Sequence, residues 1–449
     1  MVTATEIIQA KSTDSHMTER SVLIYRIVLV IFWMTVTIGF ICDEFMFLEP
    51  LRSPVLLFAD SAVTVLGLFT LRKRCDILLA ATFIVFSLVS TLWINHESIA
   101  VWLNGFRFYI GLIFLVPLFR YLLNSKYGEY YREQFDRQLL ILLWVQMFCI
   151  IYQFVKYGAG DHGGGSFGNG SSGMISMTVY AVSFYLSMRH WDSSRSYISN
   201  FYNCSTYIFL LLPTFFNETK VSLILFPLYF LLLMPIDRQS ILRQLRLLPF
   251  VLVLGYGAVY LYGRATGGNT TDLFTSDFYE HYLVGDHPFD EIEEIARNCR
   301  DGVYDRTSIF EVDIPRLAKL AFLPATLADA DGGIIAGAGL GQYKGGTILG
   351  KTRFARDNDW ILEGSVPMIF FIIIETGILG AIWFFTDMIY IIGFRSRKRG
   401  YDINVRLMLA ALFGISLLYA DVFKYLCFCF PFIYIAMSVN VSSSESQKS

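Results

Sequence analysis

The chain has 449 residues, of which 55% are apolar, 16% are aromatic and only 16% are charged. Soluble domains average about 25% charged residues, so this composition excludes an ordinary soluble protein and places most of the chain in lipid. The formal net charge of −2 gives no electrostatic basis for a nucleic-acid partner.

Apolar stretches bounded by polar residues recur along the whole chain. Most of them approach the roughly 20 residues that an α-helix needs to cross a bilayer. The sequence therefore predicts an all-α polytopic membrane protein with about twelve transmembrane helices. The predicted spans cover residues 22–42, 53–71, 76–94, 107–124, 138–157, 173–188, 203–216, 219–235, 247–263, 364–393, 404–420 and 422–439.

Charge alternates between successive loops. Basic residues gather in every second loop, whereas the opposite short loops carry acidic residues, such as Asp43 and Glu44 in the first. By the positive-inside rule, this alternation predicts that both termini face the cytoplasm. The basic loops are 71–74, 120–137, 189–195, 237–246 and 395–399.

One predicted outer loop is far longer than the others. It divides the chain into spans one to nine (1–263), a large periplasmic loop with amphipathic helices (264–363), and spans ten to twelve with a short cytoplasmic tail (364–449). Within the loop, residues 308–327 mix apolar with charged side chains. This pattern predicts a helical segment that either lies flat on the membrane surface or packs on the spans.

Several ionisable residues lie at the predicted outer ends of spans, where charges are costly and usually functional. Snorkelling to the interface is the alternative for any single one of them. As a group, cations beside the long loop predict an anion site. Asp60 and Glu375 differ from them, because they fall deep inside predicted spans. The outer-end residues are Arg107, Lys220, Arg264 and the Asp421/Lys424 pair.

Other candidates lie in the long loop. Arg306 suits bidentate phosphate binding, with a solvated arginine as the alternative. Arg356, Asp357 and Asp359 precede the tenth span. Their mixed signs suit both an anion clamp and a general base, against the alternative of a solvated loop end. The acidic pair in the first outer loop, residues 43–44, is a weaker candidate base.

The glycine-rich segment 163–170 precedes the sixth span. Its backbone N–H groups would be able to cradle a phosphate near a helix start. It lacks the lysine of a P-loop, however, and a flexible outer turn is an equal alternative.

Short motifs follow one another in a characteristic order. They are Gly165-Ser166-Phe167-Gly168-Asn169, Thr219-Lys220-Val221-Ser222, Asp305-Arg306-Thr307-Ser308-Ile309-Phe310, Gly337-Ala338-Gly339-Leu340-Gly341, and Asp357-Asn358-Asp359 followed by Glu375-Thr376-Gly377-Ile378-Leu379-Gly380. Together with twelve spans and one dominant outer loop between spans nine and ten, this order resembles the O-antigen polymerase and ligase superfamily, the Wzy-type polymerases. The resemblance covers nearly the whole chain.

The resemblance implies a GT-C-like membrane glycosyltransferase of the bacterial inner membrane. Such an enzyme transfers a glycan chain en bloc from undecaprenyl pyrophosphate to a lipid-linked repeat unit at the periplasmic face, in polysaccharide biosynthesis that yields lipopolysaccharide or exopolysaccharide. The transfer inverts the anomeric carbon and requires no cofactor or metal. Expected partners are the undecaprenyl-pyrophosphate-linked oligosaccharide, membrane lipid and, as a further candidate, a chain-length regulator protein.

The resemblance also assigns residue roles. A general base takes the proton of the acceptor hydroxyl, and the candidates are Asp357, Asp359 and Glu218. Cations meet the leaving pyrophosphate. The candidates for that role are Lys220, Arg306, Arg107, Arg264 and Arg356.

This chain departs from the family pattern at two positions. The ligase branch carries a His-Asn-like pair where this chain has Asp357-Asn358-Asp359, and Lys220 stands where the family often has an arginine. A ligase-type glycosyltransferase is kept as an alternative. A twelve-helix polysaccharide flippase or transporter is the other, although such folds usually show two similar halves, which a single large loop interrupts.

Overall fold

The part of the chain that the structure describes consists of helices and connecting turns, without a β-strand. The structure is a computed structural model. It describes residues 4–158, 163–192, 194–216, 221–233, 316–328, 330–343, 350–362, 366–393 and 401–445, with the single residues 249, 253, 256, 257 and 260.

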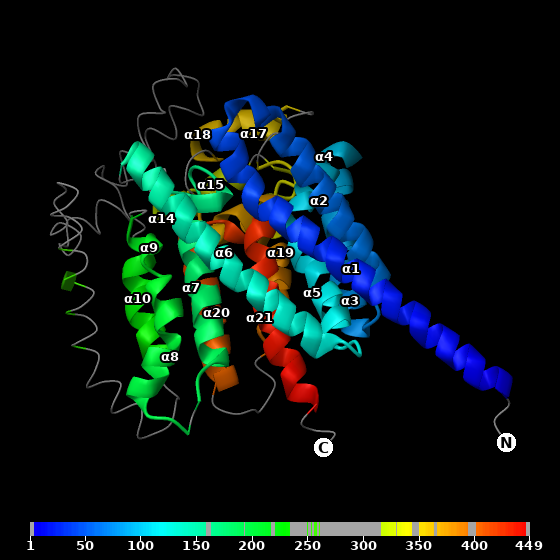
Figure 1. The fold of residues 1–449 in the computed structure, drawn as a ribbon. Helices are drawn as coiled ribbons and strands as arrows, with labels where there is room; N and C mark the ends of the chain where they lie inside the picture. Colours follow the sequence, from blue (N-terminus) through cyan, green and yellow to red (C-terminus); the bar gives the residue numbers. More distant parts are fainter. Residues whose placement is uncertain are drawn as a thin grey trace.

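The helices of the N-terminal half overlap the predicted spans, although several of them begin earlier than predicted (Figure 1). Short 3-10 helices and one π-helical turn, η2, interrupt them. They are α1 (Ala4–Glu44), η1 (Met46–Leu48), α2 (Glu49–Thr70), α3 (Arg74–Leu88), η2 (Val89–Ile94), α4 (Ile99–Phe106), η3 (Arg107–Tyr109), α5 (Ile110–Leu123), α6 (Gly128–Tyr157), η4 (Gly165–Phe167), α7 (Ser172–Arg189), α8 (Tyr197–Phe209), α9 (Pro213–Phe216) and α10 (Val221–Leu232).

The C-terminal half contains several short helices before the last three long ones. They are α14 (Arg316–Ala321), α15 (Leu323–Leu327), α16 (Gly333–Ala336), α17 (Arg353–Asp357), α18 (Asp359–Leu362), α19 (Met368–Ile392), α20 (Tyr401–Tyr419), η7 (Val422–Lys424) and α21 (Leu426–Glu445).

Seven helical segments of the described residues are long and apolar enough to cross a membrane. The prediction of an all-α polytopic membrane protein is confirmed at this level. The count of twelve spans and the orientation stay predictions, and the predicted span 247–263 lies almost entirely outside the described residues. The seven segments are Arg20–Glu44, Met46–Thr70, Arg74–Ile94, Ile99–Leu123, Gly128–Tyr157, Met368–Ile392 and Asp402–Tyr419.

Burial separates central from peripheral helices. Nearly every residue of α5 and α7 is buried, and α21 packs against both of them. α2 and α3, by contrast, expose large apolar side chains, such as Phe69 (62% exposed) and Leu78 (68%). A bundle that is apolar both inside and on its outer surface is suited to lipid rather than water.

The two ends of the bundle are named here by the predicted orientation. At the outer end, α1, η2 and α6 finish, and α17 and α18 lie at this end in Figure 1. At the inner end, α2 and α5 finish, and α21 runs toward this end.

The described end of the predicted long loop belongs to the bundle. Phe322, Leu323 and Leu327 of the α14–α15 segment are buried in the same apolar core as the spans, and so are Leu340 and Tyr343. Of the two alternatives predicted for residues 308–327, packing on the spans is therefore the one that residues 316–327 adopt.

The fourth span begins earlier than predicted. The sequence predicts residues 107–124, but the apolar helical segment runs from Ile99 to Leu123 and is interrupted by η3. The sequence predicts a span boundary at Arg107, because a charge usually lies at the interface. In the structure it lies inside the span, where Asp60 of α2 neutralises it.

Candidate functional site

Helix α19 is broken at Gly377. This residue has φ 64° inside an otherwise helical segment, a left-handed conformation that glycine adopts without steric cost. The break releases backbone groups that a continuous helix would use itself. The carbonyl oxygens of Ile374 and Glu375 accept hydrogen bonds from the N–H groups of Ala338 (2.8 Å) and Gly339 (3.1 Å).

The glycine motif at 337–341 therefore docks into the break of α19. Its contacts leave no room for side chains: a Cβ on Gly337 would meet the backbone at Gly377, and one on Gly341 would meet the carbonyl of Val101 in α4. The Glu375 side chain completes the docking, because its Oε1 accepts a hydrogen bond from the Gly341 N–H at 3.1 Å. Two motifs that the sequence shows separately are thus one structural unit.

The π-helical turn η2 holds the other side of this glycine segment. Thr91 Oγ1 accepts a hydrogen bond from the Leu340 N–H at 2.9 Å, and Ser90 Oγ donates to the Ala336 carbonyl at 2.7 Å. The Asn95 amide donates to the carbonyl of Gly337 at 3.0 Å and accepts from the N–H of residue 332 at 3.1 Å. π-Helical turns are rare and occur frequently at functional sites.

A buried lysine lies beside the docked segment. Lys424 of η7 has a side chain only 8% exposed and forms an ion pair with Asp421. Its ammonium group lies 5.2 Å from the ring centre of Tyr343, 5.4 Å from that of Phe371 and 5.1 Å from that of Tyr425, so it is also held by cation–π attraction.

The protonation of this lysine follows from its neighbours. Burial disfavours the charged form of Lys424, whereas the ion pair with Asp421 favours it, so the ammonium group is retained. Burial likewise raises the pKa of Tyr343, so the phenol stays neutral. The ammonium group of Lys424, together with its counter-ion Asp421, therefore lies beside an aromatic hydroxyl.

The second cation of this region comes from η3. Arg107 Nε lies 3.4 Å from Asp60 Oδ2, and the arginine side chain remains 27% exposed. Its guanidinium also lies 5.4 Å from the ring centre of Phe108. η3 packs directly on η7, so the elements that carry Arg107 and Lys424 are neighbours.

We call this region the junction. It comprises Arg107–Tyr109, residues 337–343, Glu375–Gly377 and Val422–Lys424. Each segment departs from regular α-helical geometry, and together they bring two cations, Arg107 and Lys424, and the buried carboxylate of Glu375 into one part of the bundle. Backbone that leaves helical geometry inside a membrane protein is tolerated where it is buried in protein or lines a binding site.

The predicted base residues lie elsewhere, on the surface at the outer end. Asp357 pairs with Arg353 at 3.5 Å, and Asp359 pairs with Lys351 at 2.6 Å. With Arg356 they occupy α17 and the start of α18, so the structure does keep these three predicted residues together. Arg107 is in a different group, the junction.

Four predicted site residues lie outside the described part of the chain. They are Glu218, Lys220, Arg264 and Arg306. Their roles stay predictions.

The glycine-rich segment before α7 serves the fold. The N–H of Gly165 donates to Gln153 Oε1 (2.7 Å), that of Ser166 to Gln146 Oε1 (2.9 Å), and that of Asn169 to Asp43 Oδ2 (2.5 Å). Because side chains of the protein occupy these donors, the segment functions as a docking turn between α1 and α6. This arrangement leaves the phosphate-cradling alternative without support.

The acidic pair in the first outer loop is used in the same way. Asp43 forms an ion pair with Arg52 at 2.9 Å. Glu44, whose side chain is 4% exposed, pairs with Lys156 at 2.6 Å and accepts a hydrogen bond from Tyr157 at 3.3 Å. Each carboxylate has a cationic partner, and these ion pairs link α1 to α2 and to α6.

Sequence reasoning missed the aromatic half of the junction. Tyr109 and Tyr343 lie in apolar or glycine-rich stretches where a tyrosine is unremarkable, and no local signal marks them. The charged half did leave a signal, because Glu375 is a carboxylate within an apolar stretch, and Arg107 and Lys424 stand at predicted outer ends of spans.

Comparison with protein-family models, with curated proteins and with solved structures finds no significant match for this chain.

Proposed function

We propose that the protein is a membrane glycosyltransferase of the polysaccharide-polymerase type, which transfers a glycan chain from undecaprenyl pyrophosphate to a lipid-linked repeat unit at the outer face of a bacterial inner membrane. One observation carries the proposal. Arg107 and Lys424 are placed on adjoining irregular segments inside an apolar bundle, beside the break of α19.

Fixed cations are what this chemistry needs most. When a glycosyl group leaves undecaprenyl pyrophosphate, negative charge develops on the departing diphosphate. Cations that are already in place in a low-dielectric environment stabilise this charge more strongly than solvent does. Lys424 is held by its aromatic neighbours as a compact point charge, whereas Arg107 offers a planar fork that fits phosphate oxygens.

The reaction is a single displacement. The oxygen of the acceptor hydroxyl forms a bond to the anomeric carbon while the bond from that carbon to the diphosphate oxygen breaks, and the electron pair leaves with the diphosphate. The acceptor proton passes to a carboxylate, for which Asp357 and Asp359 are the described candidates and Glu218 is the third. Lys220, Arg306, Arg264 and Arg356 are the remaining candidates for the diphosphate.

The partly exposed Arg107 gives the cleanest test, because its loss leaves the buried lysine pair intact. In cells that lack the native gene, R107Q should reduce long polymer to single-repeat product, since removing one preorganised charge-stabilising donor lowers the rate about 10²–10³-fold. R107K, which keeps the charge, is the matched control. The measurement is the ladder of glycan lengths on a gel, with membrane levels of each variant followed by immunoblot.

The same assay separates the competing functions. A full-length ladder from R107Q at normal membrane level would reject the proposed role. Loss of single-repeat product as well would indicate a flippase.

The candidate bases are tested in the same assay. D357N and D359N are compared with D331N, which changes an exposed carboxylate in the turn before α16. At least one of the two should lose polymer about 10²–10⁴-fold while D331N does not.

A further inference from the structure

A second polar cluster lies at the inner end of the bundle, away from the junction. A cavity of about 410 Å³ opens there between the ends of α2 and α5, the start of α3 and the first span. Four basic side chains line it, Arg72, Lys73, Arg120 and Lys126, against a single carboxylate, Asp76. This excess of positive charge favours an anionic occupant.

Among the described residues, Arg120 is the one of these four cations that forms an ion pair. Arg120 pairs with Asp76, whose other oxygen accepts a hydrogen bond from the Tyr390 hydroxyl at 2.6 Å. Among the residues that the structure describes, none forms a hydrogen bond or ion pair with the side chain of Arg72 or Lys126. These two basic side chains are therefore available to bind an anionic ligand.

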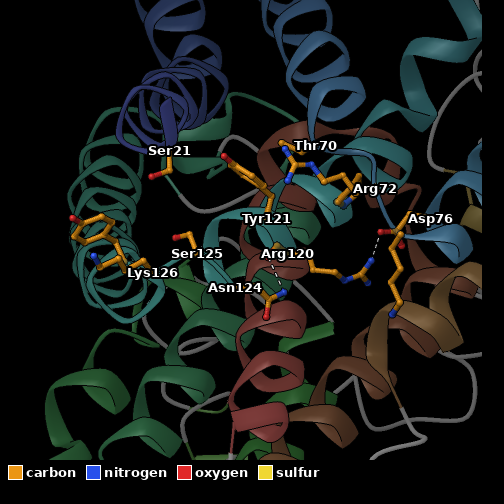
Figure 2. A pocket seen from close by; sticks show the side chains of 12 residues that line it. Ser21, Thr70, Arg72, Asp76, Arg120, Tyr121, Asn124, Ser125 and Lys126 are labelled. Carbon is orange, nitrogen blue, oxygen red and sulfur yellow. Dashed lines mark hydrogen bonds and ion pairs between the residues drawn. The ribbon is translucent and has the colours of Figure 1, made fainter. Parts of the chain in front are cut away.

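Arg72 and Lys126 line opposite sides of the cavity (Figure 2). The Arg72 guanidinium lies 5.3 Å from the ring centre of Tyr121. Arg120 is turned away, toward Asp76. Contact with the ring restrains the planar guanidinium, whose fork geometry matches a phosphate group.

The surroundings favour a membrane lipid as the source of that phosphate. Thr70 lines the cavity, and the residues just before it on α2, Leu68 and Phe69, are 55% and 62% exposed. On α3, Leu78 is 68% exposed. These side chains provide an apolar surface for acyl chains next to the basic opening. Basic pockets between spans at the cytoplasmic side characteristically bind anionic lipid head groups.

We propose that this cavity binds the phosphate head group of an anionic phospholipid, with Arg72 and Lys126 as its ligands and the acyl chains along α2 and α3. The site is independent of glycosyl transfer, since it lies at the other end of the bundle. It would anchor the 71–73 turn and the α5–α6 turn to the same lipid.

The test uses the full-length protein in nanodiscs of phosphatidylcholine with and without phosphatidylglycerol. The measured quantity is the affinity for spin-labelled phosphatidylglycerol relative to labelled phosphatidylcholine. R72Q and K126Q should each lower this ratio at least about ten-fold, the effect expected for losing one charge-assisted hydrogen bond to the phosphate. R74Q is the matched control, because Arg74 is an exposed cation beside the same turn that does not line the cavity.

Each result decides the matter. If R74Q lowers the ratio as much as R72Q and K126Q do, binding reflects diffuse surface charge and the site is refuted. Inorganic phosphate is the second arm: if it displaces the labelled lipid from the wild type at millimolar concentration, the cavity is a soluble-phosphate site and the lipid assignment fails. Weakened binding in R72Q and K126Q, with preserved binding in R74Q and resistance to phosphate, supports the proposal, and an unchanged ratio in R72Q and K126Q refutes it.

Discussion

At the scale of single residues, the junction is built from charges that would be unfavourable alone. Asp60 and Arg107 neutralise one another at 3.4 Å, and Lys424 is neutralised by Asp421. A buried pair of this kind contributes little net stability compared with apolar residues of similar size, but removing one partner leaves an unpaired buried charge. The pairs are therefore better explained by function than by stability, and their energetics can be separated from activity by experiment.

Replacing Lys424 by Met should destabilise the protein by about 3 kcal/mol, because Asp421 then loses its partner inside the bundle. D421N should be destabilising for the converse reason. The double variant K424M/D421N should lose less than the sum of the two, since no charge is left unpaired. The measurement is a denaturant or thermal unfolding transition of the purified protein in detergent. Strict additivity of the two single effects would show that the pair is not coupled.

At the scale of elements, the breaks in the helices matter more than the helices themselves. The glycine motif at 337–341 enters the break at Gly377, and its N–H groups use the carbonyls that the break releases. The Glu375 carboxylate is fixed by the same docking through the Gly341 N–H. The position of the carboxylate therefore depends on backbone conformation and not only on the rotamer of one side chain.

Substituting Ala at Gly377 tests this dependence. An L-residue in a left-handed conformation costs about 1–2 kcal/mol, and the new Cβ would also press on the Ile335 carbonyl, so G377A should lower stability by at least about 2 kcal/mol. The control is G414A. Gly414 lies in α20 with open space around its Cα, and Ala there should be neutral or up to about 1 kcal/mol more stable. Equal unfolding midpoints for the two variants would mean that the α19 break carries no strain.

At this scale, some features are predictable from the sequence and others depend on how the helices pack. Long apolar runs are required for crossing lipid, so the positions of the described spans were predictable from residues alone. The interruption at η3 was not, because Arg107 looks like a boundary until Asp60 is known to lie beside it. The two glycine motifs were both visible, but their contact depends on how α19 packs, which no local pattern encodes. Tyr343 enters the junction only through that contact.

At the scale of the whole molecule, the two ends of the bundle have different chemistry. The outer end leads to a junction of buried, paired cations among aromatic rings, whereas the inner end carries an open cavity whose cations Arg72 and Lys126 are unpaired among the described residues. Both proposals assume that these ends face opposite sides of one membrane. That assumption rests on the alternation of charge between loops, so the orientation is the property on which the larger interpretation depends.

Cysteine labelling tests the orientation directly. Cys75, in the first turn of α3, is exposed at the inner end, and Asn169 is exposed in the turn before α7 at the outer end. Cys299 of the predicted outer loop is first replaced by Ser, so that it does not react. In this C299S background, a membrane-impermeant maleimide should label Cys75 only after cells are permeabilised. After the further change C75S, N169C should be labelled in intact cells, because its turn faces outward. The reversed pattern would place the junction on the cytoplasmic side, where a lipid-linked glycan exported to the outer face could not reach it, and the polymerase proposal would have to be abandoned.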